Sequence, residues 1–79
     1  MTIRDWINKI KWDKNLEPTD YYIHFYDRVS KTIEVFRFVD ILEDDGFAVK
    51  IRFDYDEIVV PIHRIRKITN KKGETLFAR

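Results

Sequence analysis

The residues best suited to chemistry lie in one short stretch, Pro61–Ile68, which carries an isoleucine at every third position. Basic and ionisable residues fill the gaps between the isoleucines: His63, Arg64, Arg66 and Lys67. A spacing of three favours a tight helical turn that leads into a strand, and Pro61 suits the first position of such a turn. We expect the isoleucines to anchor this turn while the imidazole and guanidinium groups project together. A rigid His-Arg pair is suited to holding a phosphate, because Arg presents a planar fork of donors and His a switchable one.

The sequence gives little support to catalysis or to a metal centre. It has no cysteine, no Gly-rich phosphate loop and no nucleophile motif around Ser30, its one serine. His24 and His63 are the two candidates for an acid–base pair on a cyclic phosphate, and nothing in the sequence places them together. Neither histidine forms a recognisable metal-ligand spacing with Asp27. We therefore predict no catalytic residues, no metal site and no cofactor.

A helix is predicted at the start of the chain, over residues 3–11. Apolar residues fall there at i, i+3, i+4 and i+7, namely Ile3, Trp6, Ile7 and Ile10. Thr2 is the expected N-cap, and Asp5 completes a variant of the capping box. The apolar stripe of this helix should pack on a sheet.

The remainder of the chain alternates as short strands separated by tight turns. Strands are expected over residues 21–28, 32–38, 47–53 and 57–60, again from Arg66, and finally over 74–78. Residues 39–42 are interpreted as a turn, and Gly73 is expected at the left-handed position of the last hairpin. The predicted fold class is α+β, with the N-terminal helix packed on a curled antiparallel sheet of about five short strands.

The strand expected over residues 21–28 has one face of unusual composition. Tyr22, His24, Tyr26 and Arg28 alternate on it, opposite the apolar face. A base-stacking platform needs such residues, and so does a second packed face, which is the interpretation favoured by the sequence.

Length and composition indicate a single domain over residues 1–79, with 44% hydrophobic and 15% aromatic residues to build its core. No apolar run reaches membrane-spanning length and no signal-peptide core is apparent, so we expect a cytoplasmic protein without a membrane partner. The charge is segregated: residues 61–79 hold six lysines and arginines against one acid, whereas residues 40–57 hold two against seven acids. Such segregation directs an anionic partner to the basic end, although a solvated surface of mixed charge explains it equally well.

Three motifs together resemble a small, mostly archaeal family, the RNA cyclic-group end recognition domain. They are Pro61–Ile68, the Lys71-Lys72-Gly73 turn with the ending Glu74–Arg79, and the opening segment Ile7–Asp13. The resemblance covers nearly the whole chain. Two departures stand out: Asp27-Arg28 replaces the His-Arg pair usual in the family's first strand, and Phe77 replaces a frequent Trp.

The resemblance implies a non-catalytic RNA-binding domain that recognises ends with a terminal or 2′,3′-cyclic phosphate. His63 and Arg64 are then expected on the phosphate, Arg28 and Arg66 as further charge, and Tyr26 or Trp12 on the terminal base. Simpler roles compete with these: a His63 bonded to backbone groups, arginines paired with Asp54 or Asp56, and core positions for Tyr22, Tyr26 and Trp12.

The alternative function is a protein-interaction module whose basic C-terminal hairpin docks on an acidic partner such as an RNA-processing enzyme. The sequence leaves the oligomeric state open.

Overall fold

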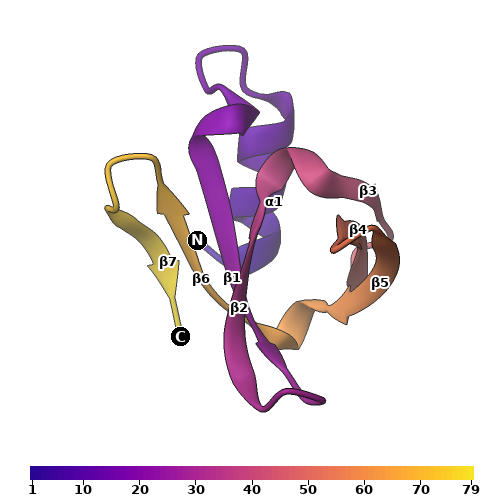
Figure 1. Ribbon diagram of the computed structural model, residues 1–79. Helices are drawn as coiled ribbons and strands as arrows, with labels where there is room; N and C mark the ends of the chain where they lie inside the picture. The colour runs from indigo at the N-terminus through magenta and orange to yellow at the C-terminus, as the bar shows by residue number, and fades with distance from the viewer.

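The computed structural model describes residues 1–79 as one α-helix, seven strands and three short 3₁₀-helical turns (Figure 1). The helical elements are α1 (Ile3–Trp12), η1 (Pro18–Asp20), η2 (Phe38–Asp40) and η3 (Ile62–Arg64). The strands are β1 (Tyr21–Asp27), β2 (Thr32–Arg37), β3 (Ile41–Asp44), β4 (Ala48–Phe53), β5 (Asp56–Pro61), β6 (Ile65–Asn70) and β7 (Thr75–Ala78). No helix has the length and apolar character that a membrane span needs.

The strands form two antiparallel sheets, of order β2-β1-β6-β7 and β3-β4-β5. The α+β class with antiparallel pairing is therefore confirmed, but the expectation of about five strands in one curled sheet was wrong. The chain leaves the first sheet through η2 and returns to it through η3, and these two 3₁₀ turns interrupt the extended backbone between the sheets. The segment 39–42, interpreted from sequence as a turn, splits between η2 and the start of β3, which pairs with β4.

The sequence pattern that predicts η3, two apolar residues three positions apart, is also present at η2. Phe38 and Ile41 are separated by three residues, like Ile62 and Ile65, and the first residue of each pair is buried in its 3₁₀ turn. A spacing of three brings both side chains of a pair to the same side of a tight turn. Both connections between the sheets therefore contain a 3₁₀ turn with apolar residues three positions apart.

The helix begins as the sequence predicts. The Thr2 side chain accepts a hydrogen bond from the Asp5 amide (3.2 Å), and the Thr2 amide donates to the Asp5 carboxylate (2.9 Å), which completes the capping box. Ile3, Ile7 and Ile10 are buried along one face. The helix ends at Trp12, one residue beyond the prediction.

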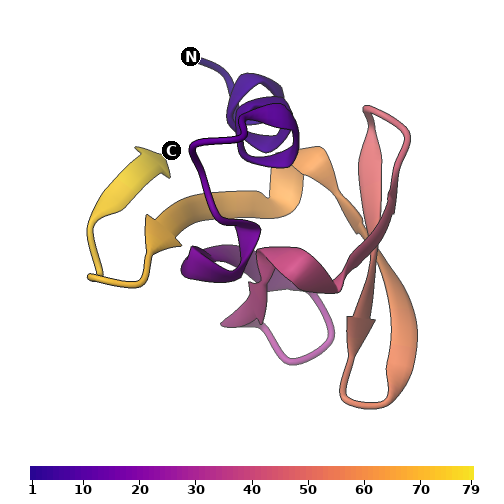
Figure 2. The same cartoon turned by 90° about the horizontal axis from the view of Figure 1, so that it is seen from above.

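Thirteen buried apolar side chains form a core between α1 and the sheets. They are Ile3, Ile7, Ile10, Ile23, Phe25, Phe36, Phe38, Val49, Ile51, Val60, Ile62, Ile65 and Ile68. Phe25 links the two sheets, since its ring centroid lies 5.6 Å from that of Phe36 in β2 and 5.9 Å from that of Phe53 in β4. In Figure 2 the β3-β4-β5 sheet stands beside the four-stranded sheet, with α1 covering one side of the latter.

All four hairpin turns contain left-handed backbone, at Lys31, at Gly46, at Asp54 and Tyr55, and at Gly73. Gly73 has φ +83 in the β6–β7 turn, which confirms its predicted role. The two-residue turn between β4 and β5 places Asp54 and Tyr55 at φ 51 and 68, the conformation of a type I′ hairpin.

Candidate nucleic-acid interface

The turn η3 is anchored as the isoleucine spacing predicts. Ile62 and Ile65 are buried on either side of it, and the Ile62 amide donates to the Phe47 carbonyl (2.8 Å), which ties η3 to the β3–β4 turn. Pro61 is the last residue of β5 and precedes the helical turn, so its predicted place inside the turn was wrong by one position. Its φ of −58 and extended ψ of 141 direct the chain from the strand into η3.

His63 and Arg64, the two polar residues of η3, have different surroundings. Arg64 is half-buried and lines a cleft of about 310 Å³. His63 is exposed and is not among the residues that line this cleft. The structure therefore does not bring the imidazole and the guanidinium into one pocket, in contrast to the sequence expectation.

Residues at the end of β1, in β4 and β5, and in η3 line the cleft, which therefore lies between the two sheets. Figure 1 shows the end of β1 close to η3. Arg28 and Arg64 both line it, although they are far apart in the sequence. Tyr26 and Val59 contribute aromatic and aliphatic wall. The full lining is Phe25, Tyr26, Asp27, Arg28, Val29, Phe53, Ile58, Val59, Val60, Pro61 and Arg64. An apolar cleft lined by two arginines is suited to an anion that carries an apolar body.

Asp27 fixes the turn that carries Arg28. Its carboxylate accepts a hydrogen bond from the Val29 amide (2.9 Å), and its carbonyl accepts from the Lys31 amide (2.7 Å). This is the local bonding by which an aspartate mimics a backbone turn. Asp27 also lines the cleft, so one negative charge accompanies the two positive ones.

The arginines of this region are not paired with carboxylates. The two ion pairs of the structure join Lys50 to Glu57 (3.1 Å) and Lys71 to Asp20 (3.7 Å). The competing explanation, in which Arg64 and Arg66 pair with Asp54 or Asp56, is therefore wrong. Arg66 is exposed and lies over the Tyr26 ring, with its guanidinium carbon 5.7 Å from the ring centroid.

Trp12 lies apart from the cleft, at the C-terminal end of α1. Its neighbour Lys11 lines a different cavity together with Pro18. Pro18 lies just before the start of β1, whereas Tyr26 lies near the end of that strand. Trp12 is 73% exposed, so the core position considered from sequence was wrong, and Lys11 Nζ lies 5.5 Å from its ring centroid.

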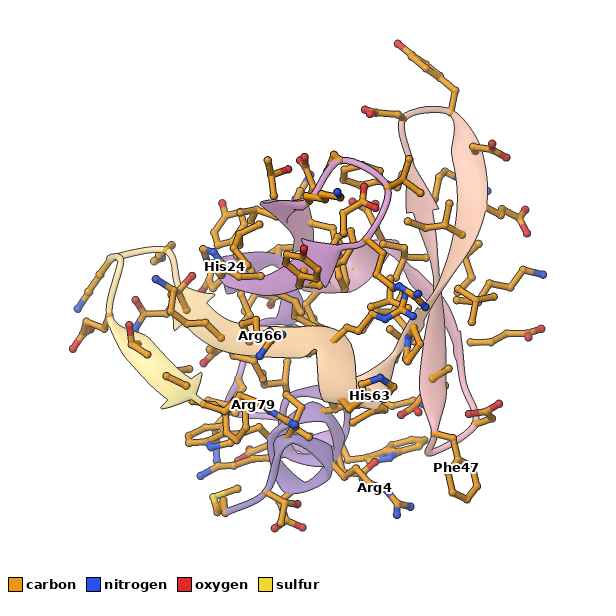
Figure 3. All side chains as sticks on the ribbon, turned by 90° about the horizontal axis from the view of Figure 1, so that it is seen from below. Arg4, His24, Phe47, His63, Arg66 and Arg79 are labelled. Carbon is orange, nitrogen blue, oxygen red and sulfur yellow. The ribbon has the colours of Figure 1, made fainter.

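His24 was considered from sequence as an acid–base partner of His63 and as part of the alternating face of β1 with Tyr22 and Tyr26. Its Nε2 lies 3.0 Å from Oγ1 of Thr69 on β6, the one buried polar residue. Burial lowers the pKa of His24 below its usual 6.5, and the positive charge of Lys67 lowers it further. Figure 3 shows His24 and His63 well apart, so they form no acid–base pair.

Comparisons with known proteins give a consistent family. A family model described as the MJ1316 RNA cyclic group end recognition domain matches residues 1–79. A UPF0248 protein of Methanococcus maripaludis strain C7 is 36% identical over 77 residues, which cover 95% of each chain. A UPF0248 protein of Saccharolobus solfataricus is 27% identical over 78 residues, covering 98% of this chain and 94% of the relative. No solved structure shows a significant match.

Proposed function

The chain belongs to the family of the MJ1316 RNA cyclic group end recognition domain, and from this premise we propose that it is a non-catalytic RNA-binding domain that receives a terminal phosphate. Its preferred end group is the 2′,3′-cyclic phosphate. The observation that carries the proposal is that Arg28 and Arg64, neither of them in an ion pair, line one cleft. Guanidinium groups bind phosphate oxygens through charge-assisted hydrogen bonds, so the two arginines hold the end group between them.

The apolar wall of the cleft suits the sugar that carries the phosphate. Ile58, Val59 and Pro61 line one side, and Tyr26 lies beside Arg28 at the end of β1. Arg66, over the Tyr26 ring, supplies further positive charge at the surface. His63 is exposed on η3, outside the cleft, and Trp12 lies near the other end of β1, so neither has a role in this proposal.

The preference for a cyclic phosphate follows from the charges of the cleft. A cyclic phosphodiester carries one negative charge, whereas a linear 3′-phosphate carries close to two at neutral pH. The Asp27 carboxylate in the cleft repels a dianion more than a monoanion, and the apolar wall imposes a larger desolvation cost on the dianion, so both favour the cyclic end. The cleft holds no histidine, and the Asp27 carboxylate is bonded to the turn, which supports binding without catalysis.

The decisive experiment compares one labelled single-stranded oligonucleotide with three ends: 3′-hydroxyl, 3′-phosphate and 2′,3′-cyclic phosphate. Fluorescence anisotropy should give the tightest binding for the cyclic end and the weakest for the hydroxyl. The double variant Arg28→Ala/Arg64→Ala should lose the difference between ends, while Arg52→Ala, an exposed arginine on β4, should keep it.

Two results would overturn the proposal. Equal affinity of the native protein for all three ends would remove end recognition and leave general RNA binding. An absence of RNA binding even at low salt would favour the interaction module instead, with the basic β6–β7 hairpin as its docking element. RNA affinity itself should fall with salt, with a log–log slope of about −0.7 per phosphate contact.

A further inference from the structure

The four-stranded sheet has a second side, away from the helix, whose composition differs from both the core and the cleft. On β1, Ile23 and Phe25 face the core, so Tyr22, His24 and Tyr26 face the other way. Residues directly opposite in an antiparallel pair share a side, which adds Arg37, Val35 and Ile33 from β2 and Thr69 and Lys67 from β6. We call this side, with Arg66, the outer face.

A bulge in β6 places two consecutive basic residues on the outer face. His24 pairs with Lys67 and Phe25 pairs with Ile65, so Arg66 is left without a partner in the register. Because Ile65 and Ile68 are both fully buried, the two residues between them turn outward. Lys67 stands opposite His24, and Arg66 reaches the Tyr26 ring.

The β2 side of the outer face is open to solvent, whereas Thr69 on β6 is buried, and the charged residues of the face are all basic. Ile33 is 51% exposed and Val35 45% exposed, and with Tyr22 and Tyr26 on the neighbouring strand they form an apolar strip along the sheet. Arg37, Arg66 and Lys67 are its charged residues, and none is in an ion pair. The nearby acid of β2, Glu34, alternates to the other side of the strand and accepts a hydrogen bond from Thr32. Figure 3 shows Arg66 and His24 on neighbouring strands of this sheet.

Resting on the function proposed above, we propose that the outer face binds the single-stranded segment of RNA that leads to the end held in the cleft. One base stacks on the Tyr22 ring and another on the Arg66 guanidinium plane over Tyr26, while Arg37 and Lys67 contact phosphates. Base stacking on aromatic and guanidinium planes, combined with a basic surface, is the general means by which proteins hold single strands.

The geometry connects the two sites. Tyr26 lines the cleft and also lies on the outer face, so RNA that leaves the cleft meets Arg66 and Tyr26 first. Tyr22 lies four residues earlier on β1, about 13 Å away at ~3.3 Å per residue. RNA is the occupant that fits this face, because tyrosine rings interleaved with three unpaired cations supply both stacking surfaces and phosphate contacts. A duplex is excluded, because its bases are already stacked and its edges alone are presented.

The test measures affinity as a function of RNA length with a constant end. Three ligands are titrated against the native protein. They are a mononucleoside 2′,3′-cyclic phosphate, a single-stranded tetranucleotide with the same end, and a blunt RNA duplex with the same end. The tetranucleotide should bind more than tenfold tighter than the mononucleotide, and the duplex should show no such gain. Tyr22→Leu, which keeps an apolar side chain at this half-buried position, should lower the affinity for the tetranucleotide by roughly 5- to 150-fold. The mononucleotide should bind this variant as it binds the native protein.

Matched controls separate stacking and charge from general effects. Tyr55→Leu removes a fully exposed tyrosine at the β4–β5 turn, and Arg52→Glu reverses an exposed charge on the other sheet; both should bind the tetranucleotide normally. Arg37→Glu should lower the affinity for the tetranucleotide. Thermal melts should show that every variant is folded.

If Tyr22→Leu and Arg37→Glu bind the tetranucleotide like the native protein, the outer face is not an RNA site, while arginine-dependent binding of the mononucleotide would preserve end recognition. If the affinity depends on RNA length and on Tyr22 but not on the end group, the proposal for the outer face is supported and the proposal for the cleft fails. If no RNA binds, both are overturned.

Discussion

The guanidinium carbon of Arg66 lies 5.7 Å from the centroid of the Tyr26 ring, which joins a bulged residue of β6 to the strand that leads into the cleft. Tyr26 therefore contributes to two surfaces at once: it forms part of the cleft wall, and it supports the Arg66 plane on the outer face. This one contact makes the cleft proposed for the RNA end and the surface proposed for the single strand continuous.

The first prediction concerns that contact. Arg66→Lys retains the positive charge but loses the planar group, so RNA affinity should fall while the salt dependence stays the same. Stability should change little, because a cation–π contact at an exposed site contributes only about 0.5–1 kcal/mol. Anisotropy titrations at several salt concentrations measure both quantities. An unchanged affinity would mean that Arg66 acts by charge alone.

A second prediction addresses Arg64. Arg64→Ala should weaken binding of an RNA with a terminal phosphate by more than tenfold, since a charge-assisted hydrogen bond is worth roughly 1.5–3 kcal/mol. Arg52→Ala is the control for loss of one positive charge. Because Arg64 is half-buried, melts of both variants are needed. A variant that melts early yet binds normally when folded would make Arg64 a structural residue.

Asp27 provides a test of end-group selectivity. Asp27→Asn keeps an oxygen that can accept from the Val29 amide, so the turn should persist, but it removes the negative charge from the cleft. Affinity for a linear 3′-phosphate should rise by about fivefold relative to the cyclic end, which corresponds to ~1 kcal/mol for one more charge interaction in water. Anisotropy with both ends measures the ratio. Equal gains for the two ends would assign selectivity to another feature.

The anchor of η3 gives a prediction for stability. Ile65 is fully buried, so Ile65→Ala should lower the free energy of unfolding by about 2–5 kcal/mol. Ile33→Ala is the matched control, because Ile33 is half-exposed on β2, and its cost should be well under half of that. Urea denaturation followed by circular dichroism compares the two. Similar losses in both variants would contradict the burial of Ile65.

The last prediction concerns pH. Burial and the charge of Lys67 on β6 hold the pKa of His24 below 6.5, and Val35 opposite it on β2 is uncharged. The unfolded chain therefore binds a proton more readily than the folded protein, so stability should fall as pH drops below about 6.5. The lowered carboxyl pKa values of Asp5 and Asp45 affect stability only near and below their ordinary value of 3.8, outside this window. Urea midpoints from pH 7.5 to 5 should fall for the native protein but less for His24→Gln. If the urea midpoints of the native protein and of His24→Gln fall equally with pH, the loss of stability comes from a group other than His24.

Local interactions allowed the sequence to predict several elements correctly. The capping box of Thr2 and Asp5, the left-handed turn at Gly73 and the isoleucine-anchored turn at η3 each depend on residues within four positions of one another. Their backbone conformations follow from sterics and nearby hydrogen bonds, which the sequence states directly. The three motifs that resemble the family likewise identified it without reference to the fold.

The tertiary structure alone decided which of these elements meet. The separation into two sheets, the common cleft of Arg28 and Arg64, the exposure of Trp12 and the contact of Arg66 with Tyr26 all join segments distant in sequence. A periodic pattern states which side of a strand is buried, but not which strand lies beside it, because pairing is chosen by the packing of the whole core. The bulge at Arg66 shows the same limit: one residue that the β1–β6 register leaves unpaired determines which basic side chains share a surface with the tyrosines of β1.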